Sequence, residues 1–202
     1  MRKHFILLVL FISLGISSSA QERVFHAGLL GGVSFSQVLN DGLSHYSKLG
    51  FYGGGFISTE FSELWSGEIG FTYVMKGSKE RFFNNTGYNG YKMTLGYIEF
   101  PFLAKVRFQK IDVEFGLSVG ILVNSNEENW YQDQTFSSSE FEGIEFAGII
   151  GVNYDFNDTW GINLRSTNSI FPIRYPTDNV YHPPFYGQRN IILTLAVRYF
   201  IR

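Results

Sequence analysis

A two-residue alternation of apolar and polar side chains constrains the fold of this chain more than any other feature. Between Trp65 and Lys76, mostly large apolar side chains alternate with mostly small or charged ones. A similar alternation returns over residues 111–124, 144–156, 160–165 and 190–202. A period of two places successive side chains on opposite faces of a β-strand. No segment after residue 20 keeps a helical period, so we predict an all-β protein.

Three earlier segments follow the same pattern less cleanly. They span residues 25–37, 49–59 and 91–108, and the second is centred on three consecutive glycines. The third contains Pro101, which has no N–H for the strand ladder, so we expect a β-bulge near it. The chain therefore has eight candidate strands. Each is long enough to cross a membrane as a strand, which takes about 9–11 residues.

The breaks between these strands alternate in length. Short breaks lie near residues 62–64, 109–110 and 157–159, and long polar breaks lie near 38–48, 77–90, 125–140 and 169–188. Short turns at one end and long loops at the other are typical of outer-membrane barrels. We predict an eight-stranded antiparallel up-and-down transmembrane β-barrel, with both termini at the short-turn end.

The two faces of the strands suggest which side meets lipid. A soluble barrel points its apolar face inward, whereas an outer-membrane barrel points it outward. Here one face is almost purely apolar and the other carries charges of both signs, a pattern that fits either architecture. The loop alternation, the N-terminal segment and aromatics at strand ends, such as Trp65, Trp160 and Tyr199, favour the membrane barrel. A soluble periplasmic ligand-binding barrel remains an alternative.

The first 20 residues have the layout of a secretory signal peptide. Arg2 and Lys3 precede an apolar run over 5–16, and Ser18 and Ala20 occupy the −3 and −1 positions of a cleavage site. The run is shorter than the roughly 20 residues of a membrane-spanning helix. We predict cleavage after Ala20, a barrel domain over 21–202, and a location in the outer membrane of a Gram-negative bacterium.

Several segments of the 21–202 region carry a family resemblance. They are Gly31–Gln37, Gly50–Gly54, Tyr73–Lys79, Tyr97–Leu103, Phe115–Gly120 and Val197–Phe200, and the Ile-Glu-Phe-Pro sequence at 98–101 is the most specific. Through them the region resembles the PorT-like outer-membrane β-barrel domain family of Bacteroidetes. The resemblance implies an eight-stranded outer-membrane barrel, but a shared fold does not fix an activity. A relative linked to protein secretion implies a transport or secretion accessory as one alternative.

The polar face supplies the first group of candidate functional residues. The predicted lumen charges are Glu68, Lys76, Glu99, Lys105, Arg107, Glu114, Glu145, Arg165 and Arg198. They could form an ion path or a gate, or they could pair with one another and fill a narrow lumen. We favour the structural interpretation, because eight strands leave room for side chains but little more.

The long loops supply the second group. The candidate contact residues are Trp130, Tyr131, Tyr181, Phe185 and Tyr186. Exposed aromatics on loops stiffened by proline suit a protein or glycan partner, although the same side chains could instead extend the outer aromatic girdle. We therefore expect a non-enzymatic protein, surrounded by outer-membrane lipid, with an envelope-structural or loop-mediated binding role.

The remaining chemistry classes receive little support. The chain has no Cys, and its formal net charge of −2 gives no basis for nucleic-acid binding. A lipid-modifying enzyme is an alternative, but His45 and His182 lie in loops without a nucleophile-elbow motif, and we interpret both as solvated. We expect no catalytic residue, no metal site and no cofactor.

Overall fold

The computed structural model describes residues 25–40, 48–79, 91–129, 140–176 and 186–201. Its strands are β1 (Phe25–Leu39), β2 (Lys48–Glu60), β3 (Trp65–Lys79), β4 (Tyr91–Phe108), β5 (Ile111–Asn129), β6 (Ile144–Asp155), β7 (Trp160–Ser169) and β8 (Arg189–Ile201). Within the described ranges, no helix has the length and hydropathy needed to cross a bilayer.

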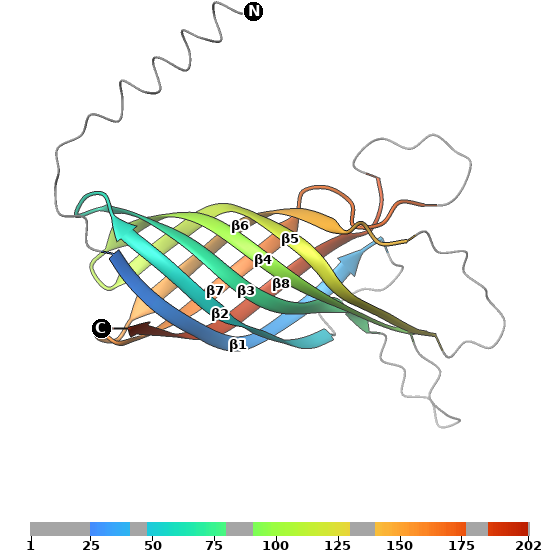
Figure 1. Ribbon diagram of the computed structural model, residues 1–202, viewed down its shortest axis with the longest axis horizontal. Coiled ribbons are helices and arrows are strands. Elements are labelled where there is room, and N and C mark those ends of the chain that lie inside the picture. Colours follow the sequence, from blue (N-terminus) through green and yellow to red (C-terminus); the bar gives the residue numbers. More distant parts are fainter. Residues whose placement is uncertain (1–24, 41–47, 80–90, 130–139, 177–185, 202) are drawn as a thin grey trace, which may run out of the picture.

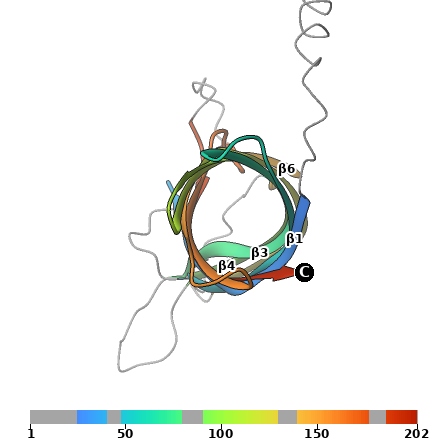
Figure 2. The same cartoon turned by 90° about the vertical axis from the view of Figure 1, so that its left-hand side faces the viewer.

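The eight strands close into one antiparallel barrel in chain order (Figures 1 and 2). Each strand pairs with the next, and β1 pairs with β8 from Ala27↔Ile201 to Leu39↔Arg189. This closing seam leaves no lone edge along the shared part of the barrel, as a wall in lipid requires. The predicted fold class is confirmed.

The connections alternate between the two ends of the barrel. Figure 1 shows the β2–β3, β4–β5 and β6–β7 turns at the end that holds the C-terminus and the start of β1. The turns are tight: the Phe61 N–H donates to Trp65 O at 2.9 Å, and the Phe156 N–H donates to Trp160 O at 2.9 Å. The long connections leave from the opposite end, as the sequence pattern predicted. We call the two ends the short-turn end and the long-loop end.

The irregularity in β4 lies elsewhere than expected. The register shift falls between Gly96 and Tyr97, where Tyr97 pairs with Leu122 and Gly96 with Asn124. Pro101 itself stays in register opposite Ser118, so the irregularity expected near this proline lies a few residues before it in β4. Gly70 of β3 leaves room for the proline ring, because an added Cβ there would lie 2.8 Å from the proline Cγ. A bare glycine neighbour lets the proline stay in the strand without an inserted residue.

The outer wall is mostly apolar over the height of a bilayer core. On β6, Ile144, Phe146, Ile150, Val152 and Tyr154 all point outward and are exposed. Ten residues of strand at the usual barrel tilt rise about 25 Å, which matches the apolar band of outer-membrane barrels. Charged side chains lie on the inner face instead, opposite to what a soluble barrel requires.

Candidate functional site

Most of the predicted lumen charges are buried inside the barrel. Alternation along β3 to β8 turns them inward, because their sequence neighbours form the apolar wall. The buried members are Glu68, Lys76, Glu99, Lys105, Glu114, Glu145, Arg165 and Arg198. Four are acidic and four are basic, so their formal charges cancel. They form two clusters.

The first cluster is centred on Glu114. Its carboxylate accepts hydrogen bonds from Arg165 Nε at 2.6 Å, Asn153 Nδ2 at 2.8 Å and Asn163 Nδ2 at 3.0 Å. Lys105 Nζ lies 3.8 Å away. Each carboxylate oxygen therefore has a donor, which is what a charge this deeply buried requires.

Glu68 extends this cluster toward the short-turn end. Its Oε2 accepts hydrogen bonds from Lys105 and from Arg198 Nη2, the latter at 2.6 Å. Arg198 also donates to Asn153 Oδ1 at 2.5 Å and lies 4.2 Å from the centre of the Phe56 ring. The aromatic face and the carboxylate both stabilise the buried guanidinium.

The second cluster surrounds Lys76, nearer the long-loop end. Its Nζ lies 2.5 Å from Glu99 Oε1 and 2.7 Å from Glu145 Oε2. Glu145 Oε1 accepts further hydrogen bonds from Ser169 Oγ at 2.5 Å and Asn190 Nδ2 at 3.1 Å. Side chains from β3, β4, β6, β7 and β8 are thus joined in one network, in which Glu99 and Glu145 contact the Lys76 ammonium directly.

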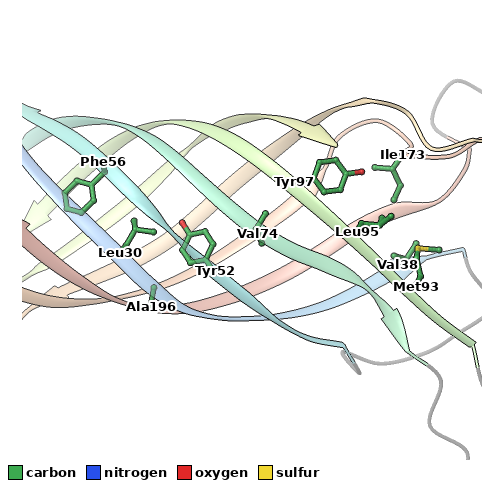
Figure 3. Packing of buried hydrophobic residues seen from close by; sticks show 10 residues of the cluster. All are labelled: Leu30, Val38, Tyr52, Phe56, Val74, Met93, Leu95, Tyr97, Ile173 and Ala196. Carbon is green, nitrogen blue, oxygen red and sulfur yellow. The ribbon is translucent and has the colours of Figure 1, made fainter. Parts of the chain in front are cut away.

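Apolar side chains fill the lumen around both clusters (Figure 3). One group lies toward the short-turn end and contains Leu30, Tyr52, Phe56 and Ala196, and another lies toward the long-loop end and contains Val38, Met93, Leu95 and Ile173. Tyr52 joins the polar and apolar parts, because its hydroxyl accepts a hydrogen bond from Arg165 Nη1 at 2.8 Å. The lumen is packed like a core.

Arg107 lies apart from the buried clusters. Its side chain is 39% exposed, and it pairs with Glu60 at 2.8 Å and Asp112 at 2.9 Å. It is the penultimate residue of β4, so the guanidinium reaches the rim at the short-turn end. Strand alternation alone predicts that a charged side chain faces inward, but it does not predict whether that side chain lies at the rim or deep in the lumen.

A short segment covers the lumen at the long-loop end. Ile173 is fully buried there, and its N–H donates to Gln188 O at 2.8 Å. Arg174 donates to both carboxylate oxygens of Glu127, at 2.9 and 2.5 Å, and its guanidinium lies 3.6 Å from the centre of the Phe141 ring. We call residues 170–176 the mouth segment.

The candidate loop contacts are described only in part. Tyr186 is exposed at the long-loop end. Trp130, Tyr131, Tyr181 and Phe185 lie outside the described residues, as do His45 and His182. Among the residues that the structure describes, no group of three or more His, Cys, Asp or Glu side chains could hold a metal ion.

Some residues of these clusters were not predicted. Asn153 and Asn163 follow the inward phase of β6 and β7, so the alternation places them in the lumen, yet nothing in the sequence joins them to Glu114. Arg174 and Glu127 are 47 positions apart, in a loop and a strand end. No local pattern identifies such a pair.

Replacing Arg174 with glutamine should loosen the mouth segment without unfolding the barrel. The variant loses a bidentate, charge-assisted ion pair with Glu127. Because Glu127 is partly exposed to solvent, we expect the free energy of local opening to fall by only about 1 kcal/mol. Hydrogen exchange at the Ile173 and Gln188 amides measures this opening. Unchanged exchange at both amides would show that the ion pair does not hold the segment.

The same contact should weaken in acid. Glu127 lies beyond the last β5–β6 pair, outside the apolar band. Burial raises the pKa of Glu127, but hydrogen bonds from Arg174 and Tyr91 outweigh it and hold that pKa below its ordinary value. A carboxylate whose pKa is lower in the folded state stabilises the fold fully at pH values above its unfolded-state pKa of about 4.3. This stabilisation is lost as the pH falls through the folded-state pKa. Exchange at Ile173 should therefore rise in that acidic range in the native chain, and less so in Arg174→Gln.

The family comparison assigns this chain to an outer-membrane barrel family. The model of the outer membrane protein beta-barrel domain family matches residues 18–174. The structure of Ail, the attachment invasion locus protein of Yersinia pestis, solved with the heparin analogue sucrose octasulfate, is 12% identical with a TM-score of 0.49, covering 88% of this chain and 99% of that one. Neisserial surface protein A is 12% identical with a TM-score of 0.48, covering 89% and 99%. Among curated proteins, none matches this chain.

Proposed function

The chain belongs to the outer membrane protein beta-barrel domain family, and from that premise we propose that it is a non-enzymatic scaffold whose long loops bind a protein or glycan at the cell surface. The filled lumen is the observation that carries this proposal. Glu114 and Lys76, one in each charged cluster, have no exposed surface. Eight mutually paired charges hold the barrel together from inside and leave binding to the ends of the strands.

The long-loop end is the part of this barrel best placed to meet an external partner. The outer wall is covered by lipid, and the turns at the other end span only a few residues. The long connections include residues 41–47, 80–90, 130–139 and 177–185, and they carry the candidate contacts Trp130, Tyr131, Tyr181 and Phe185. Aromatic side chains of this kind dominate binding energy at many interfaces.

Substitution of the loop aromatic residues tests the proposal. One variant replaces Trp130, Tyr131, Tyr181, Phe185 and Tyr186 with serine, and a matched variant replaces outward-facing Phe71, Phe102 and Phe115 with leucine. Both should keep a mobility shift on boiling, which reports a closed barrel. On arrays of glycans and extracellular proteins, we expect at least a tenfold loss of binding for the loop variant only. Equal binding by both variants, or no binding by the native chain, would contradict the proposal.

The transport or secretion alternative requires a path through or along the barrel. A steady ion current from the native chain in a planar bilayer would support it, whereas the buried Lys76 and Glu114 clusters lead us to expect none. A lipid-modifying enzyme would need a nucleophile and a general base close together. We propose no such pair among the lumen residues.

We also propose the finer assignments that the sequence suggests. These are cleavage after Ala20, insertion in the outer membrane of a Gram-negative cell, and membership of the PorT-like group found in Bacteroidetes. The motifs around residues 98–101 support the last of these. N-terminal sequencing of the chain recovered from outer membranes tests the first two.

A further inference from the structure

A shallow groove crosses the outer wall of the barrel over β5, β6 and β7. Its volume is about 600 Å³, and its lining includes Phe115, Leu117, Gly148, Ile150, Asn168 and Ile170. This volume falls within the range of about 300–1,000 Å³ that is usual for small-molecule sites. The lining is mostly apolar, and one end carries a carboxamide.

Gly148 creates the hollow. It lies between Leu117 of β5 and Asn168 of β7 in the ladder, and its strand neighbours Phe146 and Ile150 protrude on either side. A Cβ added at Gly148 would meet no atom within 4 Å. Close backbone packing therefore does not require a glycine at position 148. It does require one at Gly116, where an added Cβ would lie 2.0 Å from Phe102 O of β4.

Asn168 is the polar residue at the edge of this groove. It points outward from β7, on the face that also presents Trp160, Ile162, Leu164 and the half-buried Ser166. Its Nδ2 donates to Ser166 Oγ at 3.3 Å. A carboxamide can donate two hydrogen bonds and accept two more, so this long contact leaves most of that capacity unused. At the border of the hydrocarbon region, where few waters compete for these hydrogen bonds, an occupant with its own polar group is favoured.

The depth of the groove limits what that polar group can be. Phe146 and Phe171 stack edge to face near the long-loop end, with their ring centres 6.1 Å apart. Gly148 is two residues further along β6, which is about 5 Å deeper at the usual strand tilt. Aromatic rings mark the headgroup level of a bilayer. The groove thus begins where acyl chains join their headgroups.

We propose that the groove binds an acyl chain of a membrane lipid, with Asn168 hydrogen-bonding to the ester or amide group that links the chain to its head. The chain lies in the hollow left by Gly148, against Leu117 and Ile150. This site lies on the wall rather than at the loops, so it is independent of the proposed loop-mediated function.

A pair of glycine substitutions provides a matched test. Gly148→Leu fills the groove, and Gly31→Leu adds the same side chain to the outer wall of β1, where a Cβ also meets nothing within 4 Å. Both variants are checked for barrel closure by mobility on boiling. Native mass spectrometry then measures retention of ester-linked phosphatidylethanolamine by the purified full chain, alongside its ether-linked analogue, which has no carbonyl acceptor.

We expect the native chain and Gly31→Leu to retain the ester lipid at least tenfold better than Gly148→Leu. Asn168→Leu should lose the preference for the ester over the ether lipid while both lipids still bind. Equal retention of the ester lipid by the native chain, Gly31→Leu and Gly148→Leu would overturn the site. A dimer of the native chain that Gly148→Leu breaks would also overturn it, because the occupant would then be a second copy.

Discussion

Replacing Glu114 with alanine should destabilise the barrel by about 3–5 kcal/mol, the cost of breaking a buried ion pair by removing one partner. Arg165, Asn153 and Asn163 all donate to this carboxylate, and Arg165 would keep its charge inside the lumen. Apolar packing around the cluster leaves water little access to replace the lost acceptor. Urea unfolding of the folded chain in lipid vesicles, followed by tryptophan fluorescence, measures the change.

Glu128→Ala is the matched control for this experiment. Glu128 also pairs with a lysine, since Lys92 Nζ lies 3.2 Å from its carboxylate, but both side chains are 33% exposed. Exposed pairs of this kind contribute about 0–1 kcal/mol. If Glu114→Ala were no more destabilising than Glu128→Ala, the lumen charges would not hold the barrel together.

The wall and the lumen could be assigned from the sequence because strand periodicity is local. In β3, Glu68 and Lys76 are eight positions apart, an even spacing, so they must share a face once the segment is a strand. The outward position of Ile69 and Phe71 follows from the same phase. Strand lengths and loop lengths were enough to predict the number of strands and the end at which each loop lies.

The pairing inside the lumen could not be predicted in the same way. Arg198 and Glu68 are 130 positions apart, and they meet only because the barrel closes with a particular stagger between strands. The shift of one residue at Gly96 and Tyr97 changes which β5 side chains face inward above it. Glu127 and Arg174 depend on that shift and on a loop path, neither of which leaves a periodic signal.

Gly32→Val should prevent the barrel from closing. Gly32 pairs with Ala196 at the β1–β8 seam, where an added Cβ would lie 2.0 Å from Leu195 O and 2.6 Å from Ala196 Cα. Both are backbone atoms of the facing strand, so relief requires the two strands to separate. We expect a loss of more than about 3 kcal/mol, the upper end of the usual cost of overpacking, with little protein recovered in the heat-modifiable form.

Gly31→Val separates this steric effect from a general intolerance of valine in β1. Gly31 is the preceding residue and points outward, and a Cβ there meets nothing within 4 Å. Valine is also a better strand former than glycine, so Gly31→Val should fold at least as well as the native chain. If the two variants folded to the same extent, contact with the β8 backbone would not be the reason for a glycine at position 32.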